Sequence, residues 1–207
     1  MCCLVVQKKY EIETFFPVME GIPSEVCIRG THTWGNGLEG EVEVELNGFD
    51  LFFFAPFYKQ DFSSLEKSTR TNISFSGLAF TIEDAMMEFE INKGPLYESS
   101  LNEFLKENPG KNKNDFKNPV ANMDGLVALF PTSYHLVYQY RGIIKTLEYI
   151  NFYERKIAKT KVCIKRGENK EKLIHIYLYI PLNCCKDCEL KIGKDIQGIF
   201  WLQGVLR

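Results

Sequence analysis

The sequence predicts a mainly β protein: a closed or partly open antiparallel β-barrel with one or two short helices in an insertion. Three observations predict this fold. The segment 40–54 has the pattern of a complete β-hairpin, several later segments alternate apolar and polar residues, and glycines interrupt the strands as they do in bent strands of small barrels. The aromatic share of 14% also favours strands.

The hairpin comes first because its turn sets its register. Asn47 and Gly48 supply the two positive-φ positions of a type I′ turn. One face then pairs apolar residues, namely Leu46 with Phe49, Val44 with Leu51 and Val42 with Phe53. Phe52 and Phe54 lie on the other face, opposite Glu43 and Glu41. We expect them to be covered, either by the segment 83–107 through Leu101, Phe104 and Leu105 or by a second copy of the chain.

The other strands follow from alternation and from turn residues. We expect strands at 26–29, 72–82, 125–131, 136–152, 161–165, 173–180 and 196–206. The segment 125–131 is expected to be buried, and 136–152 to be one long bent strand or two. Gly77 is expected to mark a kink or bulge. Gly167–Lys170 is a predicted turn, and 83–90 remains open between helix and strand.

A helix and a loop form the predicted insertion at about 98–122. Ser100 and Glu103 have the spacing of a capping box, and Asn108-Pro-Gly110 ends the helix. The lysine- and asparagine-rich residues after it have little apolar surface, so we expect 108–122 to be mobile and dispensable for folding. The prediction is a single domain, 1–207, and the alternative is two small β subdomains divided near 108–124.

Bent strands and the near absence of helices favour a barrel like the oligonucleotide/oligosaccharide-binding (OB) fold. The chain has 207 residues, a formal charge of −2 and an isoelectric point near 6.0, values that give no basic signature for nucleic acid. It has neither an apolar run long enough to span a membrane nor a basic leader, so a cytoplasmic location without membrane contact is expected. Seven cysteines at irregular spacing are then read as reduced thiols.

Charge is unevenly distributed along the chain. Residues 11–54 contain nine acidic residues against Arg29 alone, whereas residues 140–172 contain ten basic residues against four acidic ones. The interpretation favoured by sheet energetics is that the two stretches lie side by side and neutralise each other.

Two segments and one sheet face are candidate ligand or metal sites. The glycine-rich loop 31–40 carries the candidate ligand-binding residues His32, Trp34, Asn36 and Glu39, although packing of Trp34 against a barrel end is favoured. Cys184, Cys185 and Cys188 form a lone Cys-x-x-Cys motif, which lacks the second ligand pair of a zinc site. Glu41, Glu43, Glu45 and Asp50 share a sheet face that could bind Ca²⁺ or Mg²⁺, but solvated glutamates are far more common.

A third segment combines bases with aromatic residues. These candidate nucleic-acid residues are Lys161, Lys165, Arg166, His175, Tyr177 and Tyr179. Aromatic rings beside cations can stack on bases and neutralise phosphates. The competing interpretation is an aromatic sheet face covered by the loop 105–122.

No nucleophile, base and orienting group converge in the sequence, so no catalytic residue, no cofactor and no tightly bound metal are expected. The leading hypothesis is a non-enzymatic cytosolic binding or interaction module of unknown partner. The first alternative is a single-stranded nucleic-acid binder that uses residues 140–179. The second is a metal-assisted enzyme that uses the thiols or the acidic face. A homodimer is compatible with each.

Overall fold

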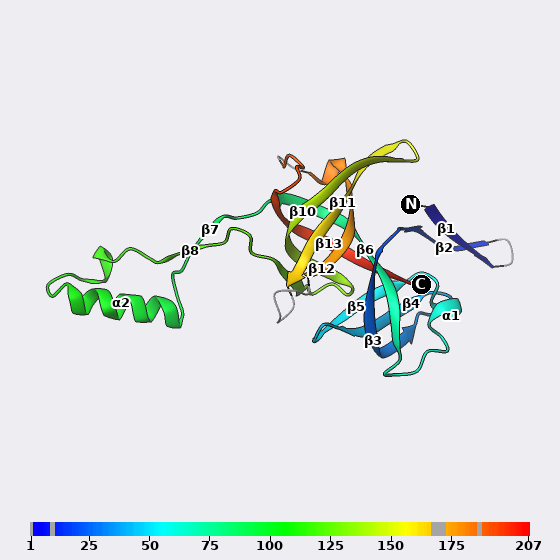
Figure 1. Cartoon of the computed structure of the whole chain (residues 1–207), viewed down its shortest axis with the longest axis horizontal. Coiled ribbons are helices and arrows are strands. Elements are labelled where there is room, and N and C mark those ends of the chain that lie inside the picture. Colours follow the sequence, from blue (N-terminus) through cyan, green and yellow to red (C-terminus); the bar gives the residue numbers. More distant parts are fainter. Residues whose placement is uncertain (1, 9–10, 167–172, 186–187) are drawn as a thin grey trace. The chain divides into compact units, whose positions relative to one another are not determined.

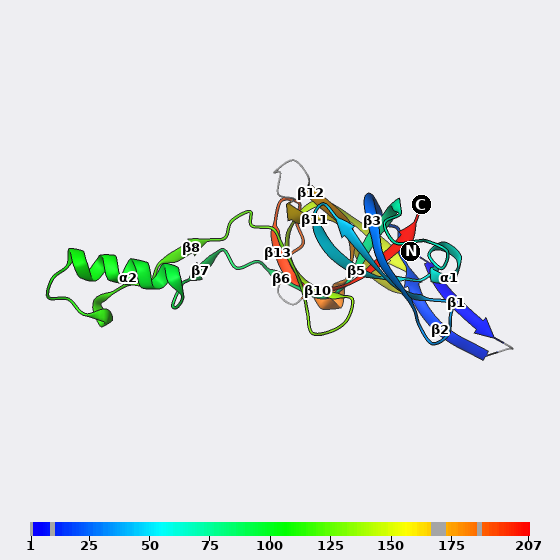
Figure 2. The same ribbon diagram turned by 90° about the horizontal axis from the view of Figure 1, so that it is seen from below.

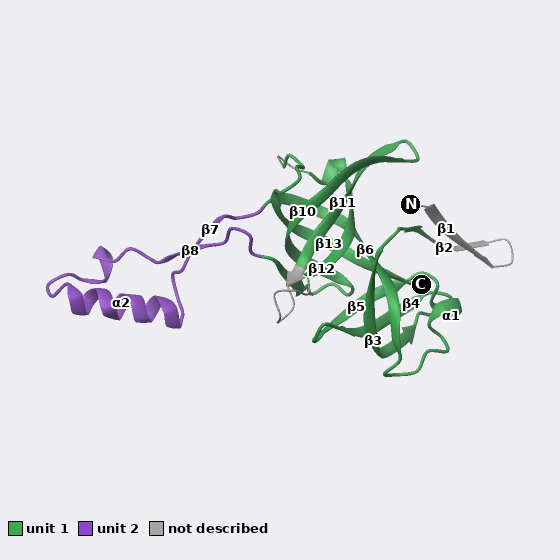
Figure 3. Cartoon of the chain, in the orientation of Figure 1, with its two compact units in different colours: residues 1–84, 127–207 green, residues 85–126 purple. Residues whose placement is uncertain are grey.

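A computed structural model describes residues 2–8, 11–166, 173–185 and 188–207; side chains are described for the same residues except 2–8, 11–15, 165 and 166. The predicted turn at Gly167–Lys170 lies outside this range. The mainly β fold is confirmed, with 56% of residues in strands and 13% in helices. The chain divides into two compact units, unit 1 (1–84 and 127–207) and unit 2 (85–126) (Figure 3).

Unit 1 contains a nine-stranded sheet and a separate two-stranded one (Figure 1). The small sheet pairs β1 (Cys2–Lys8) with β2 (Glu11–Val18). The strands of the large sheet are β3 (Ile22–Thr33), β4 (Gly40–Leu46), β5 (Phe49–Ala55), β6 (Arg70–Asp84), β9 (Ala128–Pro131), β10 (Val137–Phe152), β11 (Arg155–Arg166), β12 (Leu173–Pro181) and β13 (Asp195–Leu206). Helix α1 (Tyr58–Asp61) and the 3-10 helix η2 (Leu182–Cys184) lie in connections.

Strand pairing in the large sheet closes two circuits that share β6 and β13. One circuit runs β6-β3-β4-β5-β13, and the other runs β6-β12-β11-β10-β13. β6 serves both because residues 70–75 pair with β3 and residues 76–78 pair with β12.

The predicted antiparallel sheet is wrong in one respect. β12 runs parallel to β6, and β5 meets β13 in parallel at one residue pair, so the sheet is mixed. Parallel neighbours require a long connection between the two strands. The antiparallel prediction assumed that strands adjacent in the sequence pair through short hairpin turns.

The predicted register of the hairpin is confirmed in every pair, from Glu41 opposite Phe54 to Leu46 opposite Phe49. Its turn residues have the expected positive φ values, 52° at Asn47 and 85° at Gly48. Val42, Val44, Leu51 and Phe53 enter the main core, which continues through the apolar face of β12 at Ile174, Ile176, Leu178 and Ile180.

The second face of the hairpin is covered differently from the prediction. Phe54 is 1% exposed, and its ring contacts Phe16, Trp34 and Trp201 at centroid distances of 4.9, 5.0 and 4.8 Å. The expected cover, the helix residues 101–105, belongs to unit 2, where Phe104 instead contacts Phe116. Phe52 is 38% exposed, because its position lies beyond this aromatic cluster.

Two local predictions are also wrong. The segment 125–131 is a short, half-exposed strand and is not buried, since β9 pairs only its last four residues with the outer side of β10. The bulge in β6 lies at Phe80 rather than at Gly77. Gly77 is needed for close packing, because a Cβ there would lie 2.8 Å from the Phe200 ring. Residues 137–152, in contrast, form one long strand, which is one of the two alternatives expected for 136–152, with a register shift between Ile144 and Thr146.

Unit 2 consists of β7 (Glu88–Glu90), helix α2 (Pro95–Glu107), the 3-10 helix η1 (Lys113–Asp115) and β8 (Val120–Asn122). β7 and β8 form a two-stranded antiparallel sheet, and the chain after α2 returns beside the helix (Figure 2). The predicted capping box is wrong: α2 begins at Pro95 after Gly94, so Ser100 lies inside the helix. Proline at the first helical position favours this earlier start. The segment 83–90, open in the sequence, is the end of β6, a short connection and β7.

No helix in the described part of the chain is long and apolar enough to cross a membrane.

Candidate functional site

The β10–β11 hairpin carries exposed basic residues and exposed aromatic rings close together. The two strands pair up to Phe152 opposite Arg155, and Tyr153 with φ 52° forms the turn. The tip of this hairpin, yellow in Figure 1, extends past the other strands of the sheet. Tyr149, Tyr153 and Lys156 near the tip are exposed, whereas Ile150 and Phe152 on the other face of the ribbon are partly buried against the cluster of Met19, Ile157 and Tyr179.

Two tyrosines and a lysine dominate the tip. Tyr153 is 74% exposed, and its ring meets Phe152 edge-on at 4.8 Å. Tyr149 is also exposed, and the Lys156 ammonium lies 4.6 Å from the centre of its ring. Because Tyr149 is opposite Ala158 and Lys156 is opposite Asn151, both side chains lie on the same face of the ribbon.

The other face continues onto β12. Lys161 is opposite Tyr177, and Cys163 is opposite His175. The Lys159 ammonium lies 4.3 Å from the centre of the Tyr177 ring. Burial lowers the pKa of His175, and the charges of Lys161 and Lys145 lower it further. Lys161 and Lys145 therefore lie close enough to His175 to disfavour its protonated form.

One end of this face is already occupied by the chain itself. Lys159 forms an ion pair with Glu20 at 2.6 Å, and the Tyr179 hydroxyl donates to the Glu20 carbonyl at 3.1 Å. Tyr179 packs with Met19 and Ile157, and burial, followed by the charge of Glu20, raises its pKa. Tyr179 is thus a packing residue. The side chains of the predicted residues Lys165 and Arg166 lie outside the described part.

Residues of the glycine-rich loop 31–40 form hydrogen bonds with one another. Asn36 donates to Glu39 at 2.8 Å and accepts from the Leu38 amide at 3.0 Å. Trp34 packs against Phe54, and His32 is exposed on β3. Most of the predicted ligand-binding loop is therefore engaged in its own turn and in covering the hairpin.

The thiols of Cys185 and Cys188 lie near the buried Tyr140 hydroxyl. Burial raises the pKa of Cys188 to about 12, and a hydrogen bond to Asp84 raises it as well. Asp84 also pairs with Lys194 at 2.7 Å, and this contact lowers the carboxyl pKa. Within the described side chains, no three metal-ligating groups converge here or at Glu41, Glu43, Glu45 and Asp50. Protonated thiols of this kind are poor nucleophiles at neutral pH.

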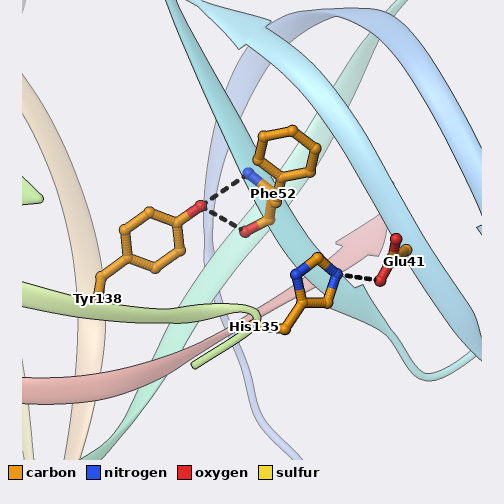
Figure 4. A network of polar contacts seen from close by, with 4 residues as sticks. All are labelled: Glu41, Phe52, His135 and Tyr138. Atoms are coloured by element: carbon orange, nitrogen blue, oxygen red, sulfur yellow. Dashed lines mark hydrogen bonds and ion pairs between the residues drawn. The ribbon is translucent and has the colours of Figure 1, made fainter. Parts of the chain in front are cut away.

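Polar contacts tie the turn before β10 to the first hairpin (Figure 4). The Tyr138 hydroxyl accepts from the Phe52 amide at 2.8 Å and donates to the Phe52 carbonyl at 2.9 Å. His135 pairs with Glu41. A shallow pocket of about 320 Å³ lies over these residues, and a second of about 400 Å³ lies beside Ser74 and Arg207. Neither has convergent groups suited to catalysis in the described residues.

No protein-family model matches the chain, and no curated protein matches it. The arrangement of residues alone therefore supports a functional interpretation. The sequence identified β11 and β12 as candidate strands but missed Tyr149, Tyr153 and Lys156. A hairpin between 137 and 166 was the available signal, yet Tyr153-Glu154 lacks the glycine that marks most two-residue turns.

Proposed function

We propose that this protein is a non-enzymatic binding module and that its ligand is single-stranded nucleic acid, bound along the β10–β11 hairpin and the adjoining face of β12. One observation carries the proposal: the hairpin presents two exposed tyrosine rings near its tip, Tyr149 and Tyr153, and the Lys156 ammonium lies directly over Tyr149. Aromatic rings stack on unpaired bases of any sequence, and neighbouring cations neutralise the phosphates.

The shape of the hairpin also favours a single strand. Tyr149 and Lys156 lie on one face of the ribbon, and Lys161 and His175 on the other. A flexible strand can follow the exposed residues around the tip, which a rigid duplex cannot do. The five-strand circuit of β6, β10, β11, β12 and β13 has the strand number of an OB fold, and we infer an OB-like barrel as its framework.

The acidic first quarter of the chain does not oppose this proposal. Glu45 pairs with Arg29, and Glu41 pairs with His135. These carboxylates are on β4, which belongs to the other circuit of the sheet. Among the described ion pairs, Glu20 with Lys159 is the one that joins the acidic and basic stretches. The metal-assisted alternative has no comparable support in the described side chains.

Tyr153→Ala tests the proposal directly. We expect the wild-type chain to bind a fluorescein-labelled single-stranded 20-mer in fluorescence anisotropy at low salt. The substitution should raise the Kd by roughly 5- to 150-fold, since a stacked base contributes about 1–3 kcal/mol. Lys156→Ala should flatten the dependence of log Kd on log salt by about 0.7, the value of one phosphate contact on a single strand.

Matched controls are available in the same chain. Tyr134 is also 74% exposed but lies in the turn before β10, and Lys67 is an exposed base after α1. Tyr134→Ala and Lys67→Ala should leave Kd and the salt slope unchanged. Absence of wild-type binding at low salt would refute the function, and equal effects of Tyr134→Ala and Tyr153→Ala would refute the site.

A further inference from the structure

The two-stranded sheet of unit 2 separates its residues cleanly into two faces. The Ile91 amide donates to the Pro119 carbonyl, and the Met123 amide donates to the Met87 carbonyl, both at 2.8 Å. Alternation along the ladder puts every second residue on one face. That face is wholly apolar and consists of Met87, Phe89, Ile91, Pro119, Ala121 and Met123. The other face carries Glu88, Glu90, Val120 and Asn122.

Unit 2 has almost no core of its own. Ala85, at its first position, is its one buried residue, and helix α2 has none. Met87 and Phe89 on the apolar face are about half exposed, at 47% and 51%. A two-stranded sheet of this size is at best marginally stable in water without further packing. Unit 2 therefore buries too little apolar surface by itself, and we expect another protein surface to pack against it.

The two edges of this small sheet differ in charge. Residues 87, 89 and 91 are at the hydrogen-bonded positions of the ladder with β8. The backbone amides and carbonyls of Glu88 and Glu90 therefore point away from β8, and those of Val120 and Asn122 point away from β7. In the structure, β8 pairs with β7 alone. Glutamates on the β7 edge are typical of edges protected against pairing. The β8 edge carries no charge.

We propose that a second copy of this chain adds its own β8 to this edge, forming a four-stranded antiparallel sheet. A two-fold axis through Ala121 pairs Val120 of one copy with Asn122 of the other, so that their outward amides and carbonyls bond reciprocally. The same axis on β7 would put Glu88 opposite Glu90 of the second copy, and this like-charge pairing is unfavourable. Charge therefore selects β8 as the self-complementary edge.

The central residue also suits this pairing. Ala121 would face its counterpart at a non-hydrogen-bonded position, where the Cα atoms approach to about 4.5 Å. On the same face, Pro119 would lie opposite Met123 of the second copy, which joins the two apolar faces. So short an interface is at the small end of the range for specific complexes, so we expect a weak dimer whose formation depends on protein concentration. This inference is independent of the nucleic-acid proposal.

Val120→Pro removes one outward amide without touching a bond to β7. Sedimentation equilibrium of the full chain should show a concentration-dependent dimer for the wild type and a monomer for this variant. Glu90→Pro is the matched control, because it removes an outward amide from the β7 edge, and it should remain dimeric. Circular dichroism spectra should show that both variants are folded.

Ala121→Lys provides a second variant, because it places like charges at the two-fold axis and should also abolish the dimer. A wild-type chain that is monomeric at about 500 µM would overturn the proposal. So would a dimer that survives both Val120→Pro and Ala121→Lys, or one that Glu90→Pro abolishes equally. A wild-type chain that forms a complex through unit 2 only with a different protein, and not with itself, would also overturn the proposal.

Discussion

Two buried tyrosine hydroxyls have opposite effects on the stability of the fold, because one is hydrogen-bonded and the other is not. Tyr138 uses its hydroxyl both as donor and as acceptor to the backbone of Phe52 (Figure 4). It thereby replaces a neighbouring strand at a point where β5 has none on that side in the described sheet. The Tyr140 hydroxyl, in contrast, is buried without a hydrogen-bond partner among the described atoms. Burial raises the pKa of both groups, to about 12 for Tyr138.

Tyr138→Phe should lower the free energy of unfolding by about 1–3 kcal/mol, because it leaves the Phe52 amide and carbonyl unsatisfied. Tyr140→Phe, the control, should leave stability unchanged or raise it, because it removes an unsatisfied group. Urea denaturation at pH 7.5 measures both. Equal losses in the two variants would contradict the assigned roles.

The same experiment has a defined pH dependence. The folded-state pKa of Tyr138 is raised above its unfolded value of 10.0 to about 12. The stability from its protonated hydroxyl is therefore complete below pH 10 and is lost as pH rises toward 12. The difference between wild type and Tyr138→Phe should accordingly shrink between pH 10 and 12.

At the scale of the elements, Phe54 packs the β4–β5 hairpin against the rest of unit 1. Its ring is surrounded by Phe16, Trp34 and Trp201, which come from three other segments of unit 1. Phe54→Ala should lower the free energy of unfolding by about 3–5 kcal/mol, as expected for a buried phenylalanine. Phe52→Ala, two residues away on the same face and 38% exposed, should cost clearly less. Chemical denaturation measures both. Similar losses in the two variants would show that the aromatic cluster around Phe54 does not contribute this stability.

Local chemistry explains which elements the sequence predicts well. Asn47-Gly48 determines the hairpin register on its own, and strict alternation identifies the core face of β12. The capping-box prediction failed because Gly94 and Pro95 offered a stronger start for the same helix. The candidate site was predicted only at the level of strands. A turn without glycine and a register shift at Ile144 decide which faces Tyr149 and Lys161 occupy.

At the scale of the whole molecule, long-range pairing limits what the sequence predicts. The acidic and basic stretches were expected to be neighbours, but β6 and β13 separate β3–β5 from β10–β12 in the described pairings. Only a contact such as the parallel pairing of β12 with β6, between residues 177–179 and 76–78, determines this arrangement. Such pairings join segments about a hundred residues apart, and no local pattern encodes them.

The division into two units leads to a prediction about proteolysis. Cleavage requires local opening, and the cost of opening rises with the apolar surface that a segment buries. The part of unit 2 after α2 buries none of its residues and contains the exposed lysines Lys111, Lys113 and Lys117. Limited trypsin digestion should therefore cut first in 108–122. In unit 1, Lys59 and Lys67 are also exposed, and they serve as internal controls.

The fragments should stay together after this cut. β6, which precedes unit 2, pairs with β13, which follows it, along almost its whole length. The nicked chain should thus elute as one species in size-exclusion chromatography and keep its cooperative thermal unfolding, with mass spectrometry locating the cut. First cleavage at Lys59 or Lys67, or separation of the two fragments, would show that 108–122 is instead packed and needed for the fold.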